Sequence, residues 1–285
     1  MTHATTRAFA DEYARHGSAR LPGLVPADIV RRLKSELYSL IRSAHSADQK
    51  IAAFDKVDGS HDRNPLFLDS GRSATVFHEP CALEWAGRVG IDQYTEAVAR
   101  VGHGLHAFPG AVRDWLDGSG LGEWSRVTGR HRPAVIETMF VRKSVHSEPL
   151  PPHLDHTYLW TDPPSVQVFW IALDRADRTN GGLLVDHCGP VPGPTHRLVR
   201  HADEARLVRL PEPAADPRTR HGLDALTLIP CDPGDAVAVD GLVLHGSAGS
   251  DGTRPRDALA VHVVDLDCEW ATTNYLGHMT PTSCR

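Results

Sequence analysis

Paired cysteines are missing from this sequence of 285 residues. It has five, an odd number, at Cys81, Cys188, Cys231, Cys268 and Cys284, and no two of them form a Cys-x-x-Cys pair. Such spacing suggests neither a structural zinc site nor a framework of disulfide bonds. Any metal site in this chain is therefore expected to use other ligands.

Long apolar runs and an excess of positive charge are also missing. No uninterrupted apolar segment approaches the roughly 18 residues that would span a bilayer, and Met1 to Ala10 lack a basic region followed by an apolar core. The formal net charge is −6, which gives no general attraction to nucleic acid or to anionic lipid. We therefore expect a cytoplasmic protein with no membrane or nucleic-acid partner. The sequence does not indicate its oligomeric state.

The composition itself is that of an ordinary globular protein. Hydrophobic residues make up 41% and charged residues 23% of the chain, and the length suits one large β-rich domain. We expect a single domain over residues 1–285, with a helical N-terminal part at about 1–130 and a barrel core at about 131–270.

The N-terminal part shows helical patterns. A short helix and a strand are predicted between Phe9 and Leu24, and a second helix starts at Pro26 and runs to about Ala44 with apolar residues at three- and four-residue spacing. A third helix is predicted between Tyr94 and Leu116, broken around its glycines. It would carry His103 and His106 on one face. A pair of this kind without further ligands at matching spacing is more often two core or rim histidines than two metal ligands.

After Pro133 the apolar pattern changes to a period of two, which is typical of strands. Turn residues at 178–182 and 232–235 separate further short apolar runs, whereas residues 189–222 show little periodicity and predict an extended loop that could act as a lid. The fold class predicted is mainly β with flanking helices, a double-stranded β-helix (jelly roll, cupin-like). The later strands are expected at Val166–Leu173, Leu183–Val185 as a return strand, Leu226–Ile229, Ala236–Leu244 ending at His245, and Ala258–Val264.

The segment His153-Leu154-Asp155 is the strongest candidate for chemistry. Side chains two residues apart on an extended strand point to the same side, so His153 and Asp155 can hold one metal ion. His245, at the end of a predicted strand far along the chain, can supply a third ligand. Two histidines and one carboxylate leave other positions open, which suits non-heme Fe(II) in oxygenases. His156 would face away from Asp155 and is a weaker candidate.

Arg256, just before the next predicted strand, could bind a carboxylate. An arginine fork meets a carboxylate through two parallel hydrogen bonds, which gives both strength and orientation. Together with the three candidate metal ligands, it predicts a metal site beside an anion site.

Further motifs accompany these candidates along the chain. The full set is His153-x-Asp155, Trp160 to Pro164, Trp170 to Asp174, Asn180-Gly181-Gly182-Leu183, Gly234-Asp235, His245-Gly246-Ser247 and Arg256. Together they resemble the phytanoyl-CoA dioxygenase family, and the resemblance covers most of the chain. The stretch Val101 to Ala107 is similar to a hallmark of one group in this family, the phytanoyl-CoA dioxygenase domain-containing protein 1 group.

The resemblance implies an Fe(II)- and 2-oxoglutarate-dependent oxygenase on a jelly-roll fold, with O2 as the other co-substrate. It implies that His153, Asp155 and His245 bind iron and that Arg256 pairs with the distal carboxylate of 2-oxoglutarate. Further co-substrate contacts are implied for Ser247, Trp170, Met139 and Arg100.

The expected reaction is hydroxylation or oxidative cyclisation of a small molecule, in the tailoring of a natural product, with release of succinate and CO2. Candidates for the substrate side are His103, His106, His156, Tyr158 and Trp160. Two alternatives stay open: a zinc or manganese hydrolase or isomerase on a cupin-like barrel, which would have no use for Arg256, and a ligand-binding barrel without turnover.

Overall fold

The computed structural model describes residues 3–47, 49–54, 64–144, 147–211, 216–252, 254–277 and 281–283. Cys284 lies outside them. Among the residues described, no helix is long and apolar enough to cross a bilayer.

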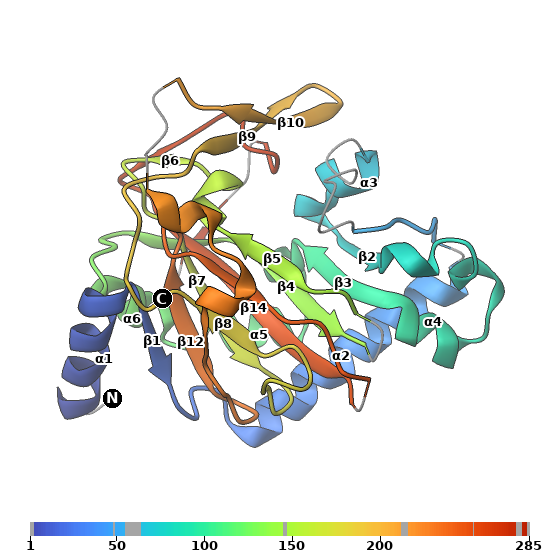
Figure 1. Cartoon of the computed structure of the whole chain (residues 1–285). Coiled ribbons are helices and arrows are strands. Elements are labelled where there is room, and N and C mark those ends of the chain that lie inside the picture. Colours follow the sequence, from blue (N-terminus) through green and yellow to red (C-terminus); the bar gives the residue numbers. More distant parts are fainter. Residues whose placement is uncertain are drawn as a thin grey trace.

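Helices lie mainly in the first half of the chain (Figure 1). They are α1 (His3–His16), α2 (Ala27–Ser46), α3 (Pro65–Leu68), α4 (Ile91–Ala97), α5 (Ala111–Leu116) and α6 (Leu121–Val127), with short 3₁₀ turns that include η5 (Leu105–Ala107) and η6 (Asp155–Thr157). The expected helices at the N-terminus and after Pro26 are confirmed as α1 and α2.

Two antiparallel sheets face one another and form the jelly roll that the sequence predicts. The larger sheet has the order β1 (Ser18–Leu21), β12 (Ala236–Asp240), β7 (Gln167–Ala172), β14 (Arg256–Asp265), β4 (Pro133–Lys143), β3 (Val98–His103) and β2 (Ala74–His78), with β16 (Thr282–Ser283) paired to β4. The smaller sheet has the order β11 (Thr227–Leu228), β8 (Leu183–Val185), β13 (His245–Ser247) and β5 (Leu150–His153). Two short ladders join β6 (Thr161–Asp162) to β15 (Glu269–Trp270) and β9 (His196–His201) to β10 (Glu204–Arg209).

Alternation along the central strands separates the two faces of the larger sheet. On β14, Leu259, Val261 and Val263 pack in the cluster that includes the helices, whereas Ala258 and Ala260 face the smaller sheet. Both faces of the strand are therefore buried. The face toward the smaller sheet lines a cavity.

Helix α2 covers the outer face of the larger sheet (Figure 1). Its buried residues Val30, Leu33, Leu37 and Ile41 recur at three- and four-residue spacing, which gives one continuous apolar stripe. The stripe packs against β2 and β3 and fixes the sheet from behind.

The prediction of one helix between Tyr94 and Leu116 is wrong. Only α4 and α5 are helical there, and between them the chain forms β3 and η5. Val98, Val101 and Leu105 have helical spacing, but β3 lies between β2 and β4, so that all six of its residues are buried. Burial on both faces of a strand removes the period of two that would have identified it.

The strand expected over Ala236–Leu244 is two strands in different sheets. β12 ends at Asp240, whose carbonyl accepts a hydrogen bond from the amide of Val243 at 2.9 Å and whose carboxylate accepts one from the amide of Leu242 at 3.0 Å. This turn moves the chain into the smaller sheet, so that His245 begins β13 instead of ending a strand.

The strand Leu183–Val185 is confirmed as β8, but it does not return along β7. It pairs with β11 and β13, so the turn at 178–182 carries the chain from one sheet to the other. Arg256 was expected just before a strand, but it is the first residue of β14.

In its described part, 189–211 and 216–222, the segment 189–222 is not one extended loop. It contains the hairpin of β9 and β10, which projects beyond the barrel (Figure 1). Only Leu198 and Ala205 of this hairpin are buried, and because most of its side chains are polar or exposed, its sequence carries little apolar periodicity.

Leu37 tests the packing of α2 on the sheet. Its side chain is completely buried, so we expect Leu37→Ala to lower the free energy of unfolding by about 2–5 kcal/mol. The exposed Ser39 on the same helix is the control, and Ser39→Ala should change stability by less than about 0.5 kcal/mol. Urea denaturation measures both, and equal effects would contradict the placement of this helix face.

Candidate active site

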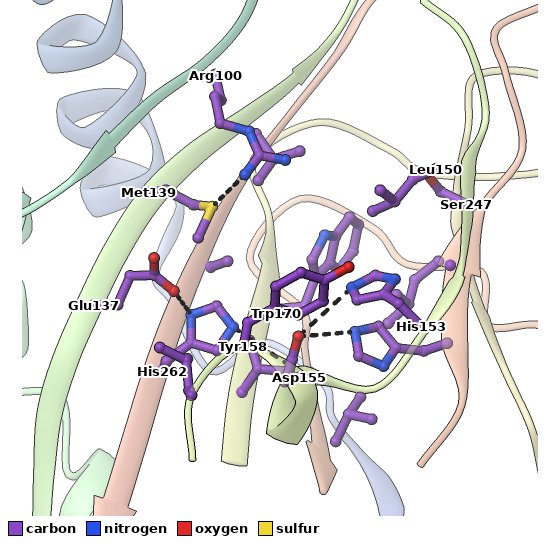
Figure 2. Close-up of a pocket in the computed structure, with 18 of the residues that line it drawn as sticks. Arg100, Glu137, Met139, Leu150, His153, Asp155, Tyr158, Trp170, Ser247 and His262 are labelled. Atoms are coloured by element: carbon purple, nitrogen blue, oxygen red, sulfur yellow. Dashed lines mark hydrogen bonds and ion pairs between the residues drawn. The ribbon is translucent and has the colours of Figure 1, made fainter. Parts of the chain in front are cut away.

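A cavity of about 210 Å³ opens between the two sheets. Its walls come from alternate residues of β4, β7 and β14 on one side and from β5 and β13 on the other. Figure 2 shows the labelled side chains that point into it: Arg100, Glu137, Met139, Leu150, His153, Asp155, Tyr158, Trp170, Ser247 and His262.

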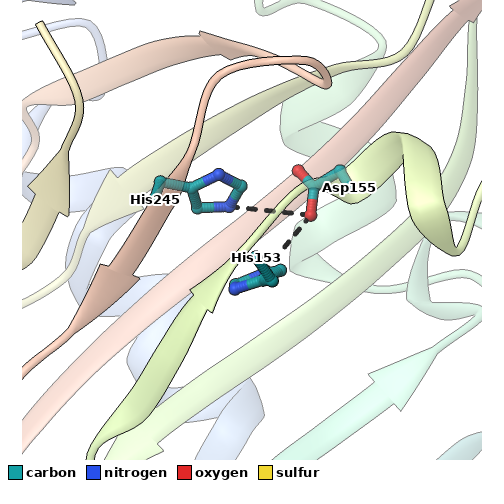
Figure 3. A group of neighbouring side chains, drawn as sticks. All are labelled: His153, Asp155 and His245. Atoms are coloured by element: carbon teal, nitrogen blue, oxygen red, sulfur yellow. Dashed lines mark ion pairs between the residues drawn. The ribbon is translucent and has the colours of Figure 1, made fainter. Parts of the chain in front are cut away.

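His153, Asp155 and His245 meet at one end of this cavity (Figure 3). Oδ1 of Asp155 lies 3.6 Å from Nε2 of His153 and 3.6 Å from Nε2 of His245. One ligand atom from each residue lies within 4.8 Å of the other two. The structure thus brings together the three side chains that the sequence singled out.

The pairing of β5 with β13 places His153 directly opposite His245. β5 ends at His153, and Asp155 starts the turn η6, so Asp155 is not on the strand as expected. The prediction of a shared side still holds because Leu154, between them, keeps an extended conformation.

Backbone carbonyl groups fix the orientation of both imidazoles. Nδ1 of His153 lies 3.0 Å from the carbonyl oxygen of Pro151, and Nδ1 of His245 lies 3.0 Å from that of Val243. A carbonyl oxygen can only accept, so each Nδ1 donates, and in the neutral imidazole each Nε2 then keeps its lone pair toward the centre of the cluster. This is the tautomer that a histidine needs to bind a metal through Nε2.

The charges at this end also suit a cation. Burial would raise the pKa of Asp155, but the surrounding imidazoles of His245, His262 and His153 hold it well below its usual range. Burial lowers the pKa of His245 to about 4, so this imidazole is neutral at physiological pH. A carboxylate with two imidazoles is a donor set that fits Fe(II).

Arg256 lies in the same cavity, at the start of β14. Its guanidinium is 1% exposed and donates to the carbonyl oxygens of Val141, at 3.3 Å, and Gly181, at 2.5 Å. Nε has no hydrogen-bond partner among the residues that the structure describes, and no ion pair with a carboxylate is found for Arg256 in that part of the chain. Burial lowers its pKa to about 10, which still leaves a cation at neutral pH.

The other residues expected to contact the co-substrate line the same cavity. Trp170 lies beside Arg256, with the guanidinium carbon 5.2 Å from the ring centroid. Met139 accepts a contact from Arg100, whose Nη1 lies 3.5 Å from its sulfur (Figure 2), and Ser247 faces the cavity from β13.

Of the five residues expected on the substrate side, only Tyr158 lines this cavity. His156 points away from it and stacks on Trp160 with ring centroids 4.5 Å apart. His103 and His106 are buried outside the cavity, where Nδ1 of His103 contacts Ser70 at 2.6 Å and Nδ1 of His106 contacts Thr138 at 3.0 Å. Both are core histidines, as their lack of further ligands at matching spacing indicated.

Three buried residues of the cavity were missed by the sequence analysis. Nδ1 of His262 lies 2.9 Å from Oε2 of Glu137, and Nε2 lies 3.4 Å from Oδ2 of Asp155, while the hydroxyl of Tyr275 donates to Glu137. Burial alone would lower the pKa of His262, but the two carboxylates raise it to about 10. The period of two on each strand could have identified Glu137 and His262, because they alternate with residues of the apolar core; nothing local singled out Tyr275.

A second cluster of possible ligands, His131, Asp265 and Asp267, has a structural explanation. Asp265 accepts hydrogen bonds from the backbone amides of His131, Arg132 and Asp267 at 2.6–3.1 Å. These contacts hold a turn at the end of β14, and they account for the acidic group without an ion.

Sequence comparison with known families adds to this geometry. The family model described as phytanoyl-CoA dioxygenase (PhyH) matches residues 13–258. The chain is 28% identical over 259 residues to phytanoyl-CoA dioxygenase 1 of Oryza sativa subsp. japonica, covering 90% of this chain and 88% of the relative. It is 25% identical to phytanoyl-CoA dioxygenase domain-containing protein 1 of Mus musculus, covering 87% and 83% of the two chains.

Solved structures share the fold. EctD from S. alaskensis with bound Fe aligns with a TM-score of 0.63 at 16% identity, covering 100% of this chain and 86% of that one. AviO1 from Streptomyces viridochromogenes Tue57 aligns with a TM-score of 0.60 at 20% identity, covering 95% and 100%. The family match spans most of the chain and includes the cluster of two histidines and a carboxylate, so this protein belongs to the phytanoyl-CoA dioxygenase family of Fe(II)- and 2-oxoglutarate-dependent dioxygenases.

Proposed function

We propose that His153, Asp155 and His245 bind the Fe(II) of this dioxygenase. The observation that carries the proposal is the convergence of one ligand atom from each of these three residues within 4.8 Å, at the wall of a cavity. Both histidines have their Nδ1 atoms occupied by backbone carbonyls, so no other tautomer competes. Protein donors on one side of an ion leave the cavity side free for co-substrates.

Arg256 binds the distal carboxylate of 2-oxoglutarate in this proposal. Its guanidinium is buried without a carboxylate partner in the described part of the chain, and a buried charge is costly unless it is paired. Ser247 adds a hydroxyl donor, Trp170 and Met139 form the wall, and Arg100 adds a second cation beside Met139. A dicarboxylate fits such a site because it provides one anionic end for the metal and one for Arg256.

With Fe(II), 2-oxoglutarate and O2 bound, the site supplies oxidation of a substrate C–H bond with release of succinate and CO2. The chain would contribute orientation and exclusion of water: the buried strands β4, β7 and β14 form one wall of the cavity, and Tyr158, directly after η6, also lines it. A carboxylate at position 155 fills the place that related halogenases leave for chloride, which favours hydroxylation or oxidative cyclisation.

The substrate we propose is a small molecule in natural-product tailoring. Structures of similar fold include SnoN, an epimerase, and SnoK, a carbocyclase, both from nogalamycin biosynthesis, with TM-scores of 0.59 and 0.60. The cavity volume of about 210 Å³ is below the roughly 300–1,000 Å³ of common ligand pockets. A long acyl-CoA, which the names of the curated relatives suggest, would have to lie largely outside it.

The whole chain acts as one catalytic domain in this proposal. Its support is that β1, near the N-terminus, and β16, near the C-terminus, belong to the same sheet. The cytoplasmic location and the absence of a nucleic-acid partner stay predictions.

Removal of the carboxylate tests the metal ligands. We expect Asp155→Ala to reduce the iron retained after anaerobic loading from about one ion per chain to nearly none, because the only anionic donor is lost. The neighbouring His156 is the matched control, since its imidazole is equally buried but stacks on Trp160. His156→Gln should keep its iron, and equal loss in both variants, measured by elemental analysis, would contradict the assignment.

Arg256→Ala tests the co-substrate site. We expect it to weaken 2-oxoglutarate binding by about 2–5 kcal/mol, or roughly 30- to 4,000-fold, because a buried charge pair loses one partner. Iron content should stay near that of the wild type. Arg254, two residues earlier, pairs with Asp177 at the surface, and Arg254→Ala should bind 2-oxoglutarate normally in anaerobic titration. Unchanged affinity in Arg256→Ala would exclude the role.

Succinate release tests the substrate class. We expect small cyclic natural-product precursors to increase succinate formation above the rate without substrate, and phytanoyl-CoA to leave it unchanged, because most of an acyl-CoA would lie outside a cavity of about 210 Å³ and make few contacts with its walls. Asp155→Ala supplies the background rate. Succinate formation in response to phytanoyl-CoA, with the hydroxylated acyl-CoA as product, would overturn the substrate class but not the metal site.

A further inference from the structure

The two oxygens of Asp155 have different surroundings. Oδ1 faces the two Nε2 atoms of His153 and His245, at 3.6 Å from each. Oδ2 faces away from them and forms an ion pair with Nε2 of His262 on β14 at 3.4 Å, without a hydrogen bond to any residue that the structure describes (Figure 2). His262 therefore lies behind the carboxylate, on the side opposite the imidazoles that would share a metal with it.

His262 is itself fixed from its other side. Nδ1 contacts Oε2 of Glu137 at 2.9 Å, and the two residues are directly opposite one another in the pairing of β14 with β4. Glu137 also accepts a hydrogen bond from Tyr275, whose ring stacks on Phe67 with centroids 4.8 Å apart. A chain of buried contacts thus runs from Tyr275 through Glu137 and His262 to Asp155.

We propose that His262 is a positioning residue that makes Asp155 bind iron through Oδ1 alone. A carboxylate can bind a metal through one oxygen or through both, and binding through both occupies a position that a co-substrate needs. Because His262 contacts Oδ2 from behind, that oxygen is kept from turning toward the metal. This inference rests on the metal ligands proposed above.

Outer contacts of this kind determine both the orientation and the affinity of metal ligands. His262 does so from a central strand, where it is paired with Glu137 immediately before a β-bulge in the ladder of β14 and β4. A role limited to packing would need only the shape of the imidazole. A positioning role needs the donor at Nε2, and this difference can be measured.

The experiment compares His262→Leu, His262→Gln and His106→Leu. Leu removes the donor, whereas Gln places an amide donor near the position of Nε2. His106 is the control because its imidazole is as buried as that of His262 but lies outside the cavity. Each protein is titrated with Co(II) under anaerobic conditions and followed by visible absorption, and relaxation of water protons with Mn(II) reports the number of bound waters. Thermal unfolding without metal reports stability separately.

We expect His262→Leu to lower Co(II) affinity by about 10- to 100-fold and to reduce the waters on Mn(II), because Asp155 then binds through both oxygens. His262→Gln should recover most of the affinity and the full water number, and His106→Leu should match the wild type in both. Tyr275→Phe, which removes only a hydroxyl, should lower affinity in the same direction by less, and it carries the test if the Leu variant does not fold.

An unchanged Co(II) affinity and water number in His262→Leu, with wild type binding normally, would overturn the positioning role and leave the metal ligands intact. The same result in Tyr275→Phe would do so where the Leu variant is unfolded. If the wild type itself binds no metal, or binds it equally well as Asp155→Ala, the proposed metal site fails and this inference fails with it.

Discussion

The antiparallel pairing of β5 with β13 is the contact on which the candidate metal site depends. His153 and His245 are far apart in the sequence and become neighbours because they face one another in this ladder. A slip by one residue would turn one imidazole to the opposite face of the sheet. Gly246 helps to fix the register: a Cβ at this position would lie 2.7 Å from the carbonyl oxygen of Leu150, so the close approach of the two strands requires glycine.

Buried charges in the cavity are unevenly paired. At one end Asp155 and Glu137 share His262, so two carboxylates are partly balanced by one imidazolium. Farther along, Arg256 and Arg100 are buried without carboxylate partners in the described residues, and both have a lowered pKa of about 10. Their desolvation weakens the free protein, and an anionic ligand would offset that cost. In the proposed function, these two buried cations attract the dicarboxylate co-substrate.

The sequence predicted the parts of this protein that repeat a local pattern. The alternation of β4, the stripe of α2 and the order of His153, Asp155, His245 and Arg256 were all visible, and the structure brings these four side chains into one cavity. The prediction of a helix between Tyr94 and Leu116 failed because β3 is buried on both faces. A strand without alternation can have apolar residues at the three- and four-residue spacing of a helix. The two-sheet path of the chain was also not visible, since Asp240 ends β12 through side-chain contacts that no periodicity reports. Tyr275 joined the site only through tertiary packing of the C-terminal segment.

A change of backbone period at Asp155 accounts for which residues face the cavity. From His153 to Asp155 the chain is extended, so side chains two apart share a side. From Asp155 the chain turns into η6, where side chains three apart share a side. Asp155 therefore shares the cavity with His153 behind it and Tyr158 ahead of it, while His156 is turned outward onto Trp160. One short turn thus joins the candidate metal ligands to the part of the cavity wall that Tyr158 forms.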